Sequence, residues 1–178
     1  MVRLERFEQG DFQQLIEWIN DEELLIAWSG NLFSFPLTQH SLEWYISDTN
    51  EVNNSTAFVF KVVDEDGKMI GHISLGSISW KDRSARLTRV LVGDSGSRGK
   101  GYCYEMVKAV LKIAFEELKL HRVGLGVYGS NPGAVRCYER AGFITEGVSR
   151  DIMRYKNNWL SMIEMSILED EWRQQNAS

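Results

Sequence analysis

The chain has 178 residues, with 25 acidic and 20 basic side chains and a formal net charge of −5. This length fits one domain, and a composition that is 43% hydrophobic with only 2 prolines excludes disordered and collagen-like chains. The acidic balance argues against a nucleic-acid partner. Apolar runs such as Leu24–Trp28 are far shorter than the ~20 residues that a membrane helix needs.

The two cysteines, Cys103 and Cys137, form no CxxC pair and have no histidine nearby at a ligand-like spacing. We therefore expect no metal site. The first residues, Met1–Arg6, lack the apolar core of a signal peptide. Together these features predict two unpaired, noncatalytic thiols in a reducing cytoplasm.

The first half of the chain is predicted to contain two helices and an antiparallel meander. Apolar residues at helical spacing follow Asp11, which with Gln14 resembles a capping box, and Thr38 is expected to cap a second helix. The stretch Asn20–Pro36 shows no regular period. Strands are expected, in order, at Arg3–Phe7, Thr56–Val63, Met69–Trp80 and Ala85–Val92.

The second half is predicted to alternate helices and strands. Asn131 and Pro132 form a favourable helix start, and Gly142 is a typical helix stop. We expect one domain over residues 1–168 and a loose polar tail over residues 169–178. The expected elements are a helix over Tyr104–Leu118, a strand over Arg122–Tyr128, a helix from Asn131 to Gly142, and a hairpin of Arg150–Tyr155 with Leu160–Leu168 around Asn157-Asn158.

A glycine-rich loop, within Leu91–Cys103, lies between a predicted strand and a predicted helix. The free N–H groups and the dipole at a helix start bind anions, so this loop is a candidate phosphate site. Its spacing fits neither the P-loop nor the dinucleotide fingerprint. A plain glycine-rich connection is the alternative interpretation of the loop by itself.

Two segments carry a resemblance to a known family. Arg98-Gly99-Lys100-Gly101-Tyr102-Cys103 resembles the R/Q-x-x-G-x-G/A motif of the GCN5-related N-acetyltransferase (GNAT) superfamily, with Cys103 in place of the last glycine or alanine. Asn131–Phe143 resembles the N-x-x-A-x-x-x-Y-x-x-x-G-F segment of the same superfamily. The closing residues, through Ile167, resemble the ribosomal-protein N-acetyltransferase (RimJ/RimL type) branch.

The resemblance implies a single α/β domain: a mixed, mainly antiparallel sheet of about seven strands flanked by helices. It further implies that acetyl-CoA lies between a splayed central strand pair, Ala85–Val92 and Arg122–Tyr128. The loop amides would bind the pyrophosphate of coenzyme A, Asn131 would contact the pantetheine arm, and Tyr138 would protonate the leaving thiolate. Backbone N–H groups near Leu91 and Val92 could polarise the thioester.

The implied reaction moves an acetyl group from acetyl-CoA to a primary amine by direct attack. Arg98, Lys100 and Arg136 would supply the local positive field for the cofactor. The acceptor remains open between a protein N-terminus, a polyamine and another small amine, and so does a homodimer.

The position of the expected general base departs from the family pattern. Many relatives carry a glutamate where this chain has Arg86, so the base is not evident. His72 lies on the preceding predicted strand, where a structural histidine is the simpler interpretation. A noncatalytic acyl-CoA-binding or sensor module is therefore kept as the alternative function.

Overall fold

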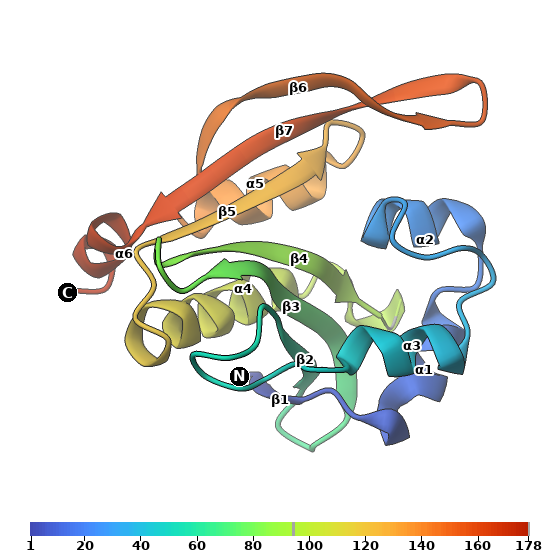
Figure 1. The fold of residues 1–178 in the computed structure, drawn as a ribbon, viewed down its shortest axis with the longest axis horizontal. Coiled ribbons are helices and arrows are strands. Elements are labelled where there is room, and N and C mark those ends of the chain that lie inside the picture. The colour runs from blue at the N-terminus through green and yellow to red at the C-terminus, as the bar shows by residue number, and fades with distance from the viewer. Residues whose placement is uncertain (94, 178) are drawn as a thin grey trace.

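A computed structural model of the chain describes residues 1–93 and 95–177. Its strands form one seven-stranded sheet in the order β1-β2-β3-β4-β5-β7-β6, which confirms the predicted fold class (Figure 1). Only the central neighbours β4 and β5 run parallel. The strands are β1 (Arg3–Arg6), β2 (Phe58–Val63), β3 (Met69–Ser79), β4 (Ser84–Val92), β5 (Arg122–Tyr128), β6 (Ile144–Tyr155) and β7 (Asn158–Leu168).

Helices cover both faces of the sheet. On β2, Phe58 and Phe60 belong to the larger core beneath α4 and α5, whereas Val59 between them belongs to the core beneath α1–α3. This alternation is expected because neighbouring strand residues point to opposite faces. The helices are α1 (Phe12–Trp18), α2 (Glu22–Ser29), α3 (Gln39–Ile46), α4 (Tyr102–Lys112), α5 (Pro132–Arg140) and α6 (Glu169–Gln175), and a π-helical turn (Ile113–Glu117) continues α4.

Two expectations for the N-terminal half are wrong. The stretch expected to be irregular contains α2, which begins where the Asp21 carboxylate accepts a hydrogen bond from the Leu24 amide at 2.7 Å. The predicted capping box of Asp11 with Gln14 does not form. Instead, the Asp11 carboxylate accepts hydrogen bonds from the Glu8 amide at 2.9 Å and from Lys61 Nζ at 3.0 Å. Asp11 therefore takes part in the capping box of the preceding 3₁₀ turn (Gln9–Asp11) and also binds a cation distant in the sequence.

The C-terminal segment also differs from its expectation. Residues 169–175 form α6 rather than a loose tail, because Trp172 is only 7% exposed and packs against the Phe115 ring at a centroid distance of 5.4 Å. The closing hairpin is longer than predicted, since β6 begins at Ile144. In Figure 1 this hairpin (orange and red) extends past the end of β5 toward α2.

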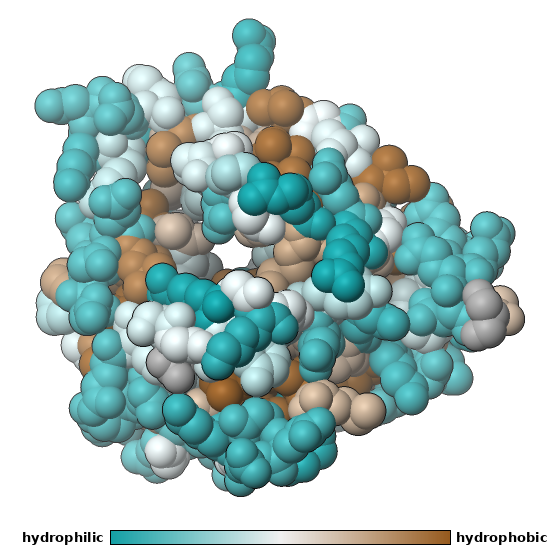
Figure 2. All heavy atoms as spheres, turned by 180° about the vertical axis from the view of Figure 1, so that it is seen from behind, coloured by the Kyte–Doolittle hydropathy of each residue, from teal (hydrophilic) through white to brown (hydrophobic). Residues whose placement is uncertain are grey.

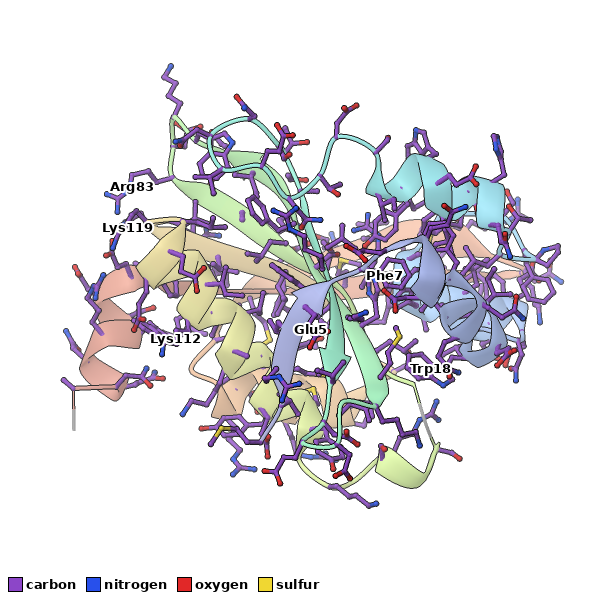
Figure 3. All side chains as sticks on the ribbon, turned by 90° about the horizontal axis from the view of Figure 1, so that it is seen from below. Glu5, Phe7, Trp18, Arg83, Lys112 and Lys119 are labelled. Atoms are coloured by element: carbon purple, nitrogen blue, oxygen red, sulfur yellow. A yellow bond between two sulfur atoms is a disulfide. The ribbon has the colours of Figure 1, made fainter. Side chains whose placement is uncertain are left out.

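The gap between β4 and β5 is the feature of the sheet that matters for a ligand. The two strands pair only from Ser84 to Arg86, although both continue beyond these residues. At the end of the gap where β4 and β5 are paired, which we call the closed end, Arg83 links the two chain segments. Its Nε donates to the Lys119 carbonyl at 2.7 Å, and its carbonyl accepts the His121 amide at 2.6 Å. Arg83 and Lys119 lie together at one edge of the molecule in Figure 3.

A β-bulge lies in β4 shortly beyond its last pair with β5. His72 on β3 faces Leu91 and Ser74 faces Thr88, so one residue of β3 is opposite two residues of β4. Arg89, the first of these two, has a left-handed φ of 51°. Such an extra residue bends the bulged strand and increases its local twist. The bulge bends the part of β4 that no longer pairs with β5, and the short pairing of the two strands confirms the predicted splayed pair.

The expectation of two unpaired thiols is wrong. Cys103 in the first turn of α4 and Cys137 in α5 form a disulfide, with their Cα atoms 6.5 Å apart. The two helices pack against each other, which brings residues 34 positions apart in the sequence within bonding distance. The disulfide thus joins the two predicted cofactor-binding segments.

We expect reduction of this disulfide to lower the free energy of unfolding by about 2–4 kcal/mol, because the bond restricts a 34-residue separation in the unfolded chain. Urea unfolding with and without a phosphine reductant measures the change. The Cys103→Ala/Cys137→Ala variant should not respond to the reductant. Alkylation of both thiols in denatured, unreduced protein would contradict the pairing.

Candidate active site

The glycine loop follows β4 and leads directly into α4. Gly101 is the N-cap of α4 with φ 84°, and Gly99 has φ 76°. A cap without a side chain leaves the amides of the first helical turn without the usual side-chain acceptor. The helix start can therefore offer these amides to an anion.

The basic side chains predicted near the cofactor are all exposed. Arg98 follows a short 3₁₀ turn (Ser95–Ser97), Lys100 lies between the two left-handed glycines, and Arg136 projects from α5. Of the three, only Arg98 lines the principal cavity described below. Exposed cations contribute modestly, because water and salt screen them.

The second predicted segment is helical as expected. Asn131 caps α5 by accepting the Ala134 amide at 3.1 Å, so Oδ1 is engaged and the Nδ2 group is the part of the side chain that remains to donate to a ligand. Tyr138 lies two turns further along the helix and is buried, with its ring edge-on to Phe143. Burial raises the pKa of Tyr138, which keeps the phenol protonated at neutral pH.

Leu91 and Val92 lie on β4 beyond the bulge, where it has left β5. Tyr102 and Cys103 begin α4, and Cys103 is held by the disulfide. The structure thus places Leu91 and Val92 on the unpaired part of β4 and joins the two predicted segments through the Cys103–Cys137 disulfide.

An acidic cavity of about 860 Å³ lies beside the glycine loop. Four carboxylates from α1, α2 and the link between them face two cations, Arg98 and Lys156. Figure 2 shows an opening near the middle of the molecule from behind, where the sheet strands diverge in Figure 1. The cavity is lined by Glu17, Trp18, Asn20, Asp21, Glu22, Glu23, Leu24, Ala27, Gly93, Ser95, Arg98, Tyr155 and Lys156.

A carboxylate that the sequence did not reveal lies beside Arg86. Glu164 on β7 is opposite Gly126 on β5, and its Oε2 accepts a hydrogen bond from the Arg86 guanidinium at 3.0 Å. Gly126 lacks a side chain that would separate the pair. The position where relatives carry a glutamate therefore holds an ion pair assembled from two strands.

His72 is fully buried among aromatic rings. Its ring contacts Phe7, Trp28 and Tyr45, at centroid distances of 4.9, 5.4 and 5.8 Å. In Figure 3, Phe7 lies where β1 leads toward α1. Desolvation lowers the pKa of His72 to about 4, so its imidazole is neutral at neutral pH.

Within residues 1–93 and 95–177, no group of three or more His, Cys, Asp or Glu side chains could hold a metal ion. None of the helices in the same residues combines the length and apolar content that a bilayer crossing requires.

Residues 2–144 match the model of the acetyltransferase (GNAT) domain family. The chain is 37% identical over 109 residues to the probable N-acetyltransferase YjcK of Bacillus subtilis, a match that covers 60% of this chain and 58% of that protein. It is 26% identical over 172 residues to the spermidine N(1)-acetyltransferase of Vibrio cholerae, covering 96% and 95% of the two chains. The crystal structure of spermidine N-acetyltransferase from Vibrio cholerae in complex with CoA and spermine superposes with a TM-score of 0.82 at 24% identity, over 96% of this chain and 97% of that one.

The splayed parallel pair and the seven-stranded sheet form a fold that this chain shares with a known acetyltransferase. The chain belongs to the GNAT acetyltransferase family. It is an N-acetyltransferase that uses acetyl-CoA.

We expect His72 to make the fold sensitive to acid. The unfolded chain takes up the imidazole proton near pH 6.5, whereas the folded chain does so near pH 4. Stability is therefore complete above pH 6.5 and falls as the pH drops toward 4, by on the order of 3 kcal/mol from this group. Urea unfolding of wild type and His72→Asn at pH 7 and pH 4 measures the difference. Equal losses in the two proteins would contradict a buried, neutral His72.

Proposed function

We propose that the chain acetylates a primary amine of a polyamine or a similar small polycation, in a ternary complex with acetyl-CoA. The observation that carries the proposal is the acidic cavity next to the glycine loop, where four carboxylates face two cations. Acids at a helix N-terminus stabilise a helix by themselves, which accounts for part of this charge on α2. Their arrangement around one cavity beside the cofactor loop supports a cationic acceptor.

The proposed acyl-donor site uses the loop and the two helices beside it. The pyrophosphate of coenzyme A binds the amides of Tyr102 and Cys103 at the start of α4, with the segment from Arg98 to Gly101 around it. The pantetheine arm passes Asn131 and enters the gap between β4 and β5. Arg136 and Lys100 add positive potential at the surface. The uncapped start of α4 and the two left-handed glycines support this placement.

The proposed chemistry is one displacement at the thioester carbon. The amine must first lose a proton, because an ammonium has no lone pair. Its nitrogen then bonds to the carbonyl carbon, amides near Leu91 and Val92 stabilise the oxyanion, and the C–S bond breaks. Tyr138 gives its phenolic proton to the departing thiolate and regains a proton from water.

Water accepts the amine proton in this proposal. Glu164 is the nearest counterpart of the glutamate that relatives carry, but it is engaged with Arg86 and Ser149. Both of its carboxylate oxygens already accept hydrogen bonds from side chains of this chain. The ion pair instead fixes the strands at the closed end of the gap.

Three finer assignments belong to the same proposal. Membership of the RimJ/RimL branch, with a peptide acceptor, is the alternative to a polyamine.

A homodimer is supported by exposed apolar side chains such as Val148 and Trp159 on the edge hairpin. A cytoplasmic location follows from the acetyl-CoA cosubstrate, although the Cys103–Cys137 disulfide is uncommon in a reducing compartment.

Gly101→Glu should abolish CoA binding, because a side chain and a negative charge would occupy the space of the phosphate. Gly67→Glu is the matched control: Gly67 also has a positive φ, of 80°, and open space around it, but lies in the β2–β3 turn. Calorimetric titration with CoA compares the two. Normal affinity in Gly101→Glu would exclude the loop from the site.

Tyr138→Phe should lower kcat by roughly 100-fold while leaving the affinity for acetyl-CoA nearly unchanged, because only the proton donor is lost. Tyr104→Phe, on the neighbouring helix, is the control. Release of the CoA thiol at saturating acetyl-CoA, with spermidine as acceptor, measures kcat. Full turnover by Tyr138→Phe would leave the residue a packing role only.

Glu22→Gln/Glu23→Gln should raise KM for spermidine roughly 3- to 10-fold at low salt, with kcat unchanged, because two exposed charges that attract the acceptor are lost. Glu116→Gln/Glu117→Gln removes the same charge away from the cavity and is expected to have no effect. The same assay across a panel with aminoglycosides and N-terminal peptides tests the acceptor class. Turnover of peptides alone would favour the RimJ/RimL alternative.

A further inference from the structure

Two buried side chains converge on one backbone carbonyl in the bulge of β4. His72 Nδ1 and the indole Nε1 of Trp28 each lie 3.0 Å from the Arg89 carbonyl oxygen. A carbonyl only accepts, so His72 carries its proton on Nδ1 and donates. The two donors occupy both lone pairs of this carbonyl, which is therefore held from β3 and from α2 together.

The side chain of Arg89 also contacts neighbouring elements, although its buried Nε has no hydrogen-bond partner among the described residues. The guanidinium lies 5.0 Å from the centre of the Tyr45 ring and donates to Thr88 Oγ1 at 2.7 Å. Tyr45 is itself fixed by a hydrogen bond to Ser74 Oγ at 3.0 Å. A left-handed arginine is an unfavourable backbone state that persists only where its surroundings impose it. Here α2, α3 and β3 together impose it.

Burying His72 costs free energy, and packing of its ring does not explain why a histidine stands at this position. Its Nε2 is buried and has no hydrogen-bond partner among the residues that the structure describes. An apolar ring would fill the same aromatic surroundings without burying an unpaired polar atom. The property that distinguishes His72 from such a ring is the Nδ1–H that holds Arg89.

The held carbonyl lies at the point where the cofactor gap opens. Pairing with β5 ends at Arg86, the bulge follows at Arg89, and the next residues, Val90–Val92, run along the open gap. The direction of this backbone decides where its amides lie relative to a thioester, and a shift of about 1 Å at such a position lowers rates strongly.

We propose that His72 and Trp28 are positioning residues for acetyl transfer: by donating together to the Arg89 carbonyl, they hold the β4 bulge and set the backbone that receives acetyl-CoA. This role rests on the proposed acetyl-CoA site between β4 and β5. Neither residue touches the reacting atoms.

The test compares variants that remove a donor with variants that keep one. His72→Phe and Trp28→Phe keep an aromatic ring and lose the donor. His72→Asn places an amide N–H near the position of Nδ1 and serves as the conservative rescue. Phe7→Leu is the packing control, because Phe7 contacts the His72 ring edge-on at 4.9 Å without a hydrogen bond to Arg89. Calorimetric titration with acetyl-CoA and thermal melting are measured for each variant, so that no acceptor is needed.

We expect His72→Phe and Trp28→Phe each to weaken acetyl-CoA binding about tenfold, the factor of roughly one hydrogen bond, and His72→Asn to restore affinity to within about threefold of wild type. Phe7→Leu should lower the melting temperature and bind acetyl-CoA normally. If His72→Phe does not fold, the affinity of Trp28→Phe is the deciding measurement: weakened binding supports the positioning role and wild-type binding contradicts it. Wild-type affinity in the folded variants that lack a donor would overturn the positioning role alone, whereas a wild-type chain that binds no acetyl-CoA would overturn the proposed site and this role with it.

Discussion

The parting of two parallel strands is the constraint on which the rest of the molecule depends. β4 and β5 pair over three residues at their starts, where Arg83 links the two chain segments, and then diverge; the extra residue at Arg89 bends β4 along the unpaired part. A continuous ladder would satisfy the backbone groups of both strands but would leave no room for a ligand within the sheet. The helices that cover the two faces of the sheet place different functional groups near this gap.

Each face contributes one half of the proposed reaction. On one face, α4 and α5 present a glycine-capped helix start, an N-cap asparagine and a protonated tyrosine, which suit a phosphorylated thioester and its leaving group. On the other, α1 and α2 present carboxylates that suit a cation. The chain carries a net negative charge, so the few basic groups near α4 matter for the cofactor and the acidic cavity matters for the acceptor. The disulfide joins α4 to α5 and fixes the spacing of the cofactor side.

The sequence predicted those parts of the structure that rest on local patterns. Alternating strand residues, the Asn131-Pro132 helix start and the glycine motif are local, and the structure confirms the elements they indicate. It did not predict what depends on register between distant strands: the Arg86–Glu164 pair forms across Gly126 of an intervening strand. The bulge also has no local signature, because a left-handed position is usually marked by glycine and here holds Arg89. Helix α2 was missed because Leu24–Trp28 is a continuous apolar run without a visible period.

The crystal structure of the acetyl-CoA complex tests the central claim most directly. The quantities to measure are the distances from the pyrophosphate oxygens to the Tyr102 and Cys103 amides and from the thioester oxygen to the β4 backbone beyond Arg89. The account predicts hydrogen-bond distances at both places, with the pantetheine between β4 and β5. A cofactor bound with its pantetheine outside this gap, or with β4 and β5 paired along their full length, would contradict it.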